Sequence, residues 1–221
     1  MNVLVAGGHG KIGLRLLRLL AQRGDVARGM IRNPDHAAEL EGAGAEAVIG
    51  DLEAEMAEQL ARRVEGSDAV VFAAGAGPGS GPERKRTVDL GGAVKLIGAC
   101  ELSGVSRYLI VSAMGVDRPG SYPPAMEPYY DAKRAADAAV RESGLEYTIV
   151  RPGRLTDDPG SGRIEAGMPL ERSGEATRDD VAATLVALLD EPGTIGLSFD
   201  LLNGELPIAD AIAALSGNPG A

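Results

Sequence analysis

The sequence predicts an α/β protein built as a doubly wound parallel sheet, with helices on both faces and a small lid at its C-terminal end. Two observations predict this fold. A short apolar run at residues 3–6 leads into glycines at positions 7, 10 and 13 and then directly into an apolar helical pattern. Beyond it, strand-like and helical patterns alternate, which is typical of βαβ units with right-handed crossovers. We therefore expect a single domain over residues 1–221, with residues 154–221 as a lid on the substrate side.

Each expected strand is a short run rich in apolar and β-branched residues. Such runs occur near residues 26–31, 45–49, 68–73, 108–111 and 147–150. Each expected helix is an Ala-rich stretch in which apolar residues recur at helical spacing between Arg and Glu. Such stretches occur near residues 34–42, 53–64, 83–103 and 128–143. A Gly- and Pro-rich stretch at 75–82 predicts a loop after the fourth strand, where a doubly wound sheet places ligand contacts.

The regular alternation ends after Arg151, Pro152 and Gly153. We expect a loop-rich segment over 154–176, a helix near 178–190, a strand near 197–202 and a last short helix near 207–215. Because these elements follow the last regular strand of the alternating pattern, we expect them to cover the carboxyl ends of the strands.

Composition and charge narrow the possible partners. Of the 221 residues, 44% are hydrophobic and 24% are charged, which is ordinary for a globular protein. The formal net charge is −10 and no block of Lys or Arg occurs, so we expect no nucleic-acid partner. No apolar run reaches the roughly 18–20 residues needed to cross a bilayer, and no signal peptide precedes the first strand. We therefore expect no membrane association, a cytoplasmic location, and a monomer or homodimer that binds a small molecule.

The cysteine and histidine content argues against a disulfide or a metal site. Cys100 is the single cysteine, and its place in a helical pattern predicts a buried apolar role. Two histidines and one cysteine cannot form an ordinary zinc site, so we expect no bound metal.

The glycine-rich turn after the first strand is suited to a dinucleotide. Gly7 permits the tight turn, Gly10 lets the backbone approach a pyrophosphate, and Gly13 lets the helix pack closely on the strand. The helix that follows offers free N–H groups and a positive dipole end to the phosphates. The candidate cofactor-binding residues of this turn are Gly7, Gly8, His9, Gly10, Lys11, Ile12 and Gly13.

The end of the second strand indicates which nicotinamide cofactor is bound. An acidic residue there would bind the ribose 2′-hydroxyl and repel a 2′-phosphate, but this chain has Arg32, nineteen positions after Gly13. A guanidinium suits a phosphate and can stack on adenine, so we expect NADP(H), with NAD as a possible alternative. The alternative for Arg32 is a solvated surface arginine. Further candidate contacts to the adenine edge and the ribose are Asp51, Leu52, Ala73, Ala74 and Gly75.

A tyrosine and a lysine predict acid–base chemistry. Tyr129 and Lys133 are four positions apart, so both project from one face of a helix. A nearby ammonium stabilises a phenolate, so we expect Lys133 to lower the pKa of Tyr129 and to hydrogen-bond the nicotinamide ribose. Ser112 ends a buried strand, where its hydroxyl can orient a substrate carbonyl. Tyr130 competes as the acid, although only Tyr129 has the right spacing to Lys133, and this spacing also occurs on plain helix surfaces.

Taken together, these motifs resemble the atypical short-chain dehydrogenases/reductases, of the compact NAD(P)H-binding kind related to epimerases and dehydratases. The matching segments span roughly residues 1–190: 7–13, 71–75, 111–115, Tyr129 with Lys133, 148–153 and 177–182. The resemblance implies that Ser112, Tyr129 and Lys133 form the catalytic set and that Pro152 and Gly153 contact the nicotinamide end. It also implies that Arg178 and Asp180 order the start of the lid helix.

Two features depart from the family pattern. Position 113 is alanine, where members with well-formed active sites often carry a second hydroxyl residue. The portion after residue 153 is also short for a nucleotide-sugar cleft. Three functions follow as hypotheses. The first is an NADP(H)-dependent oxidoreductase acting on a small carbonyl or conjugated substrate. The second is an epimerase, isomerase or dehydratase that uses a tightly bound NAD(P), and the third is a non-catalytic NADP(H) redox sensor.

Overall fold

The computed structural model of the protein describes residues 1–77, 79–120 and 122–217. Pro78 of the expected loop and residues 218–221 of the expected lid lie outside the described residues. The strands are β1 (Asn2–Ala6), β2 (Val26–Ile31), β3 (Glu46–Ile49), β4 (Ala69–Phe72), β5 (Arg107–Val111), β6 (Glu146–Pro152), β7 (Arg154–Thr156), β8 (Arg163–Gly167), β9 (Glu175–Thr177), β10 (Ser198–Asn203) and β11 (Leu206–Pro207). The helices are α1 (Lys11–Arg23), η1 (Pro34–His36), α2 (Ala37–Gly42), α3 (Ala57–Val64), α4 (Pro82–Arg84), η2 (Lys85–Gly92), α5 (Ala93–Ser103), η3 (Pro124–Met126), α6 (Glu127–Glu142), α7 (Arg178–Leu189), η4 (Pro192–Thr194) and α8 (Ile208–Ser216).

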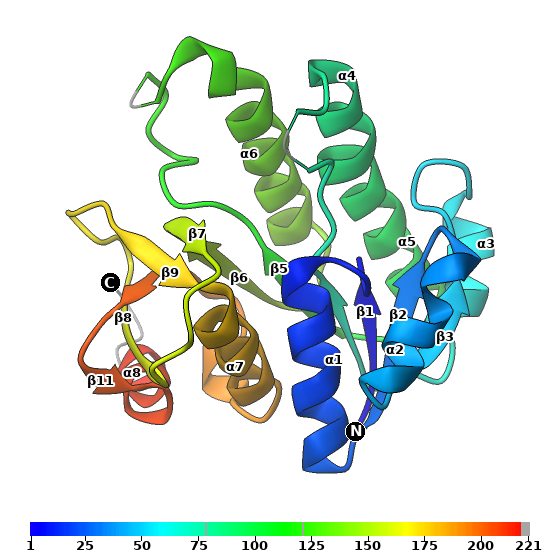
Figure 1. Ribbon diagram of the computed structural model, residues 1–221. Coiled ribbons are helices and arrows are strands. Elements are labelled where there is room, and N and C mark those ends of the chain that lie inside the picture. The colour runs from blue at the N-terminus through cyan, green and yellow to red at the C-terminus, as the bar shows by residue number, and fades with distance from the viewer. Residues whose placement is uncertain (78, 121, 218–221) are drawn as a thin grey trace.

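One large sheet organises these elements. Its strand order is β11-β8-β10-β6-β5-β4-β1-β2-β3, and helices cover both of its faces (Figure 1). In the sheet order, the seven neighbouring strands β10-β6-β5-β4-β1-β2-β3 are parallel. Beyond β10, β8 pairs with β10 and β11 pairs with β8, both in antiparallel fashion. The chain runs outward in opposite directions from β1 and β4, so the crevice beyond the carboxyl ends of these two strands is where such a sheet binds ligands. The predicted doubly wound parallel sheet is confirmed.

Alternating side chains of the strands fill two cores. In β1, Val3 and Val5 pack into one core and Leu4 and Ala6 into the other. The first core is covered by α1, α7 and α8, and the second by α3, α5 and α6. Because both faces are buried, the central strands β1 and β4 are apolar over nearly their whole length, as the sequence pattern indicates.

The C-terminal third contains more regular secondary structure than the sequence pattern predicts. Residues 154–176 were expected to be loop-rich, but they contain β7, β8 and most of β9. Here β8 pairs with β10 in the main sheet, and β7 pairs with β9 in a small parallel sheet. These strands are only three to five residues long, so they carry too little periodicity to be recognised without their partners. The expected helix, strand and helix after them are confirmed as α7, β10 and α8. The role of residues 154–221 as a lid stays a prediction.

Two helices differ from the prediction, one in its first residue and the other in its helical geometry. The helix expected near residue 53 begins only at Ala57, because the Asp51 carboxylate accepts the N–H groups of Glu53 and Ala54 and closes a turn instead. The helix expected over 83–103 is continuous through α4, η2 and α5, but η2 is a π-helical segment. Within the described ranges, the structure contains no helix that is both long and apolar enough to span a bilayer.

Candidate functional site

The glycine-rich turn between β1 and α1 is shaped by close backbone packing. Gly7 has a φ of 85°, in the left-handed region that favours glycine. A Cβ atom at Gly13 would lie 2.2 Å from the Gly7 carbonyl oxygen, so only glycine lets α1 pack this closely on the turn. A Cβ atom at Gly7 would lie 2.7 Å from the Ala74 Cα. Glycine at this position therefore lets the ends of β1 and β4 approach one another closely. The expected roles of Gly7 and Gly13 agree with this geometry.

The N-terminus of α1 is free to bind an anion. Gly10 is the N-cap, no side chain caps the helix, and its first turn contains no acidic residue. Its first N–H groups therefore remain available to donate hydrogen bonds to a phosphate, and the helix dipole also favours a negative charge there. Ile12 is buried in the core, so it can serve this site only through its backbone. Lys11 extends away and forms an ion pair with Asp157, in the segment after β7.

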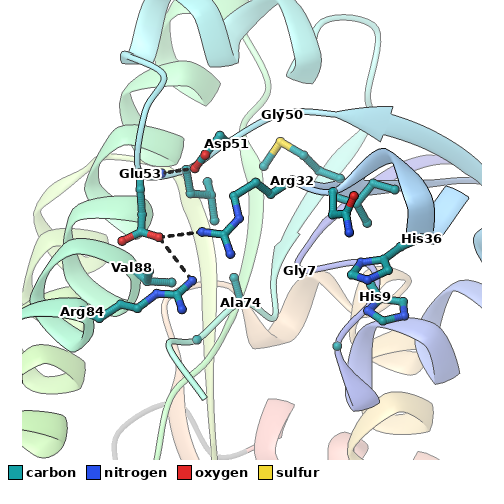
Figure 2. A pocket seen from close by; sticks show the side chains of 16 residues that line it. Gly7, His9, Arg32, His36, Gly50, Asp51, Glu53, Ala74, Arg84 and Val88 are labelled. Carbon is teal, nitrogen blue, oxygen red and sulfur yellow. Dashed lines mark hydrogen bonds and ion pairs between the residues drawn. The ribbon is translucent and has the colours of Figure 1, made fainter. Parts of the chain in front are cut away.

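A cavity of about 290 Å³ lies beside this turn. It is bounded by the glycine-rich turn, by the ends of β2, β3 and β4, and by the start of the helix that runs through α4 and η2 (Figure 2). Its lining contains the predicted residues Gly7, His9, Gly10, Arg32, Asp51, Leu52, Ala74 and Gly75, together with Met30, Ile31, Asn33, His36, Gly50, Glu53, Arg84 and Val88. Most of the residues predicted to contact adenine, ribose and phosphates thus line one cavity, which we call the adenine-end pocket after that prediction.

Two guanidinium groups meet one carboxylate at the wall of this pocket. The Arg32 Nη1 atom lies 3.0 Å from the Glu53 Oε2 atom, and the Arg84 Nη2 atom lies 3.3 Å from the same oxygen. Figure 2 shows Glu53 between the two arginines, with His9 and His36 on the other side of the pocket. Sequence reasoning missed Arg84 because it lies 52 positions after Arg32, in helix α4 rather than in the segment after β2. Glu53 stands next to the predicted Asp51 and Leu52, and that position could have indicated it.

The two histidines of the chain stack on one another at the rim of the pocket. The ring centroids of His9 and His36 are 3.6 Å apart, and the rings are nearly parallel. His9 Nε2 also lies 3.2 Å from the Glu39 carboxylate in α2. This stack joins the glycine-rich turn to the segment after β2, so it holds the two walls of the pocket together.

The predicted catalytic residues lie outside the lining of this pocket, directly after β5 and in α6. Lys133 is 4% exposed, and its ammonium donates a hydrogen bond to the Val111 carbonyl over 3.0 Å, next to Ser112. The same ammonium lies 3.2 Å from the Asp89 carboxylate in η2. Tyr129, one helical turn before Lys133, is half-buried, and its ring lies 5.3 Å from the Lys85 ammonium. We call this region, with Ser112, the catalytic end.

Asp89 is a member of the catalytic end that sequence reasoning missed. Its side chain is 1% exposed, and its second carboxylate oxygen accepts the Ala76 N–H over 3.0 Å. A Cβ atom at Gly75 would lie 3.1 Å from the first oxygen, so the carboxylate is tightly enclosed. The signal in the sequence was a lone acidic residue between Val88 and Leu90 in an apolar helical pattern.

The expected effect of Lys133 on Tyr129 is wrong. The pKa of Tyr129 is raised, not lowered, mainly by burial and further by the negative charges of Asp89 and Asp137 and by Tyr130. Lys133 does not offset these effects because its ammonium is paired with Asp89. The phenol, which is protonated at neutral pH even at its ordinary pKa, is therefore harder to ionise here.

A buried ion pair lies beneath Ser112. The Arg151 guanidinium, at the carboxyl end of β6, contacts the Asp137 carboxylate of α6 at 2.8 and 3.0 Å and the Asp117 carboxylate at 2.5 Å. Burial raises the pKa of Asp137, although the nearby Ser112 hydroxyl and Arg151 act in the lowering direction. Ser112 is buried, and its hydroxyl does not meet the geometry of a hydrogen bond with any described residue.

The remaining predicted residues lie at the carboxyl ends of β4 and β6 and at the start of α7. The Pro152 carbonyl accepts the Met114 N–H, and a Cβ atom at Gly153 would lie 2.4 Å from the Gly174 carbonyl oxygen. The contact of these two residues with a nicotinamide stays a prediction. Ala73 continues the β4 ladder by donating its N–H to the Ala6 carbonyl. The Thr177 hydroxyl caps α7 by accepting the Asp180 N–H. The Asp180 carboxylate accepts the N–H groups of Ser161 and Gly162, which agrees with an ordering role for Asp180.

Comparison with known proteins identifies the family. Residues 7–192 match the family described as NAD(P)H-binding. The chain belongs to this NAD(P)H-binding family. Over 97% of this chain and all of the relative, it is 43% identical to a Bacillus subtilis protein described as "Uncharacterized sugar epimerase YhfK". The resemblance to atypical short-chain dehydrogenases/reductases is confirmed.

Solved structures agree with this assignment. A protein provisionally assigned as an NAD-dependent epimerase/dehydratase from Bacillus halodurans superposes with a TM-score of 0.92 at 38% identity, covering 97% of this chain and 99% of that one. ChuY from Escherichia coli O157:H7, described as an anaerobilin reductase, superposes with a TM-score of 0.77 at 25% identity, covering 92% and 98%. The chain is thus similar to proteins described as epimerases and to one described as a reductase.

Proposed function

We propose that the protein is an NADP(H)-dependent reductase of a small carbonyl or conjugated compound. The observation that supports it best is the placement of Tyr129 one helical turn before Lys133, whose ammonium bonds to the Val111 carbonyl beside Ser112. The phenol of Tyr129 is protonated at neutral pH, and burial raises its pKa further. A protonated phenol can donate a proton to a substrate oxygen, as reduction requires, whereas oxidation would need a phenolate as the base. The relative described as a reductase supports the same direction.

The residues present fit a nicotinamide dinucleotide. A Cβ atom would fill the turn at Gly7 and Gly13, the N-terminus of α1 is uncapped, and the adenine-end pocket adjoins both. When bound, the reduced cofactor supplies a hydride. The Ser112 hydroxyl, which lies near the Asp137 carboxylate, would orient the carbonyl oxygen of the substrate. Tyr129 would protonate that oxygen. Two donors of the Lys133 ammonium serve Val111 and Asp89, which leaves the third for a ribose hydroxyl.

We infer a preference for NADP(H) from the residues around the ribose position. Arg32 lines the pocket directly after β2, and no acidic residue immediately follows that strand. A charge-assisted contact with the 2′-phosphate contributes about 1.5–3 kcal/mol, or roughly 10- to 100-fold in affinity. Calorimetric titration should therefore show tighter binding of NADPH than NADH, and Arg32→Ala should remove most of the difference. Equal affinities in the unaltered protein would contradict the proposal.

A second candidate is an epimerase that oxidises and re-reduces one substrate on a retained cofactor. The 43% identity to a protein described as a sugar epimerase favours it. The two functions differ in cofactor consumption. A screen of small carbonyl compounds that follows NADPH absorbance should find a substrate that consumes NADPH stoichiometrically if the protein is a reductase. Isomerised product without net consumption, together with cofactor retained through purification, would support the epimerase instead.

The glycine-rich turn gives a test of where the cofactor binds. Gly10→Val adds side-chain atoms where the pyrophosphate would approach, and even a Cβ atom there would lie 3.0 Å from the Gly7 carbonyl oxygen. We expect the variant to stay folded, as circular dichroism would show, and to lose cofactor binding. Retained binding would place the nucleotide elsewhere.

A further inference from the structure

The bridge between Arg32, Glu53 and Arg84 has an unusual distribution of contacts. A single oxygen, Glu53 Oε2, faces both guanidinium groups, while Oε1 accepts a hydrogen bond from the Thr87 hydroxyl over 2.8 Å. The bridge brings the two positive charges close together in the adenine-end pocket. Without the Glu53 carboxylate between their charges, the two guanidinium groups would repel one another. Of the donors on Arg32 and Arg84, only those facing Glu53 have a partner among the described residues.

Glu53 can leave this position without a change in the backbone. Its N–H is held by the Asp51 carboxylate over 2.8 Å, and its carbonyl accepts the Lys95 ammonium over 2.9 Å. The side chain is joined to the arginines by solvent-accessible contacts, since Arg32 is 55% and Arg84 is 44% exposed. Exposed ion pairs of this kind add little to stability, so rotation of the Glu53 side chain is sufficient to release both guanidiniums.

We propose that Arg84 is a second 2′-phosphate ligand and that Glu53 is a built-in competitor of this phosphate, so that Glu53 and Arg84 together with Arg32 set the choice between NADP(H) and NAD(H). A phosphate carries more acceptor oxygens and more charge than one carboxylate, so it takes the place of Glu53 between the guanidiniums. When the cofactor is NAD(H), Glu53 stays and accepts a hydrogen bond from the 2′-hydroxyl, as an acidic residue after the second strand does in other sheets of this kind. This inference rests on the proposed binding of a nicotinamide dinucleotide in the same pocket.

The test uses two probes that occupy only the adenine end: adenosine 2′,5′-bisphosphate, which carries the 2′-phosphate, and 5′-AMP, which does not. Both are titrated calorimetrically into the full-length protein and its variants. Glu53→Gln removes the competing charge and should raise affinity for the bisphosphate roughly 10-fold relative to 5′-AMP. Arg84→Gln should lower affinity for the bisphosphate by roughly the same factor, with little change for 5′-AMP.

Matched controls come from neighbouring exposed residues. Glu58→Gln in α3 and Arg86→Gln in η2 remove the same charges outside the adenine-end pocket and should leave the ratio of the two affinities unchanged. Thermal melting should confirm that all four variants are folded. If Glu53→Gln lowers the affinity for the bisphosphate or leaves the ratio unchanged, Glu53 does not compete and the inference is overturned. An Arg84→Gln variant with unaltered affinity for the bisphosphate would overturn the role of Arg84.

The inference and the proposed function fail in different ways. If Arg32→Ala abolishes the preference for the bisphosphate while Glu53→Gln and Arg84→Gln have no effect, the proposed NADP(H) preference stands and only this inference fails. If the unaltered protein binds neither probe nor NADPH, the proposed function fails as well.

Discussion

In the adenine-end pocket the charged side chains are exposed, whereas at the catalytic end they are buried. Arg32 and Arg84 reach solvent around the half-buried Glu53, while Lys133 and Asp89 are 4% and 1% exposed. Exposed ion pairs are weak and replaceable, but a buried charge that loses its partner is strongly destabilising. The difference separates a region that can exchange one anion for another from a region that holds its polar groups in fixed positions.

The largest effect should come from Tyr129→Phe at the catalytic end. The substitution keeps the ring and its packing but removes the hydroxyl that would donate the proton. Loss of positioned acid–base catalysis typically lowers the rate 10²- to 10⁴-fold, and we expect cofactor affinity to change little. Steady-state kinetics on a substrate from the carbonyl screen would measure both. Tyr130→Phe is the matched control and should be nearly silent. Full turnover by Tyr129→Phe would remove this tyrosine from the reaction.

Arg151→Met tests whether the buried charges hold the catalytic end together. It would leave the fully buried Asp137 carboxylate without its main partner, at an expected cost of about 3–5 kcal/mol in the free energy of unfolding. Urea denaturation would measure this. The matched control, Asp117→Asn, removes the exposed partner of the same guanidinium and should cost less than about 1 kcal/mol. Equal costs for the two variants would contradict the distinction between buried and exposed pairs.

The pH dependence of Arg151→Met follows from the raised pKa of Asp137. Burial already raises this pKa, and removal of the guanidinium would raise it further. A carboxyl group with a higher pKa in the folded than in the unfolded state binds more protons when folded, so its contribution to stability falls as pH rises. We therefore expect the destabilisation to be smaller in mildly acidic solution than at neutral pH, which denaturation at both pH values would show.

Asp89→Asn should shift the ionisation of Tyr129. The Asp89 charge is one of the causes of the raised pKa of Tyr129, and its removal also releases the Lys133 ammonium from its partner. Both effects favour the phenolate, so we expect the alkaline limb of the kcat/KM profile to move to lower pH. Ultraviolet titration of the phenolate, with Tyr129→Phe as the background, reports the same shift independently of turnover. The exposed Asp131→Asn is the control, and an unmoved limb in Asp89→Asn would contradict the prediction.

The smallest effect on stability should come from Glu53→Gln at the adenine end. Although Glu53 touches two arginines and Thr87, the arginine contacts are open to solvent, so we expect a change of less than about 1 kcal/mol in the free energy of unfolding. Urea denaturation beside Arg151→Met makes the comparison direct. A loss of several kcal/mol would mean that the exposed bridge is structural.

The regular elements could be predicted because each depends on a local pattern. The glycines at 7, 10 and 13 and the alternating apolar runs predict the doubly wound sheet, and the bounds of β2 agree with the expected run over 26–31. The strands β7, β8 and β9 could not be predicted, since each is short and is stabilised by a partner elsewhere in the chain. Local patterns do not record such pairings.

The candidate site divides in the same way. The sequence by itself determined the identities and order of Arg32, Ser112, Tyr129 and Lys133, because each stands in a motif that follows a strand or recurs at helical spacing. Only the tertiary structure decided their electrostatic surroundings. It placed Asp89 against Lys133 and Arg84 beside Arg32, and it half-buried Tyr129 with a raised pKa. The physical reason is that a pKa or an ion pair depends on distance and burial between segments, and neither quantity is encoded in spacing along the chain.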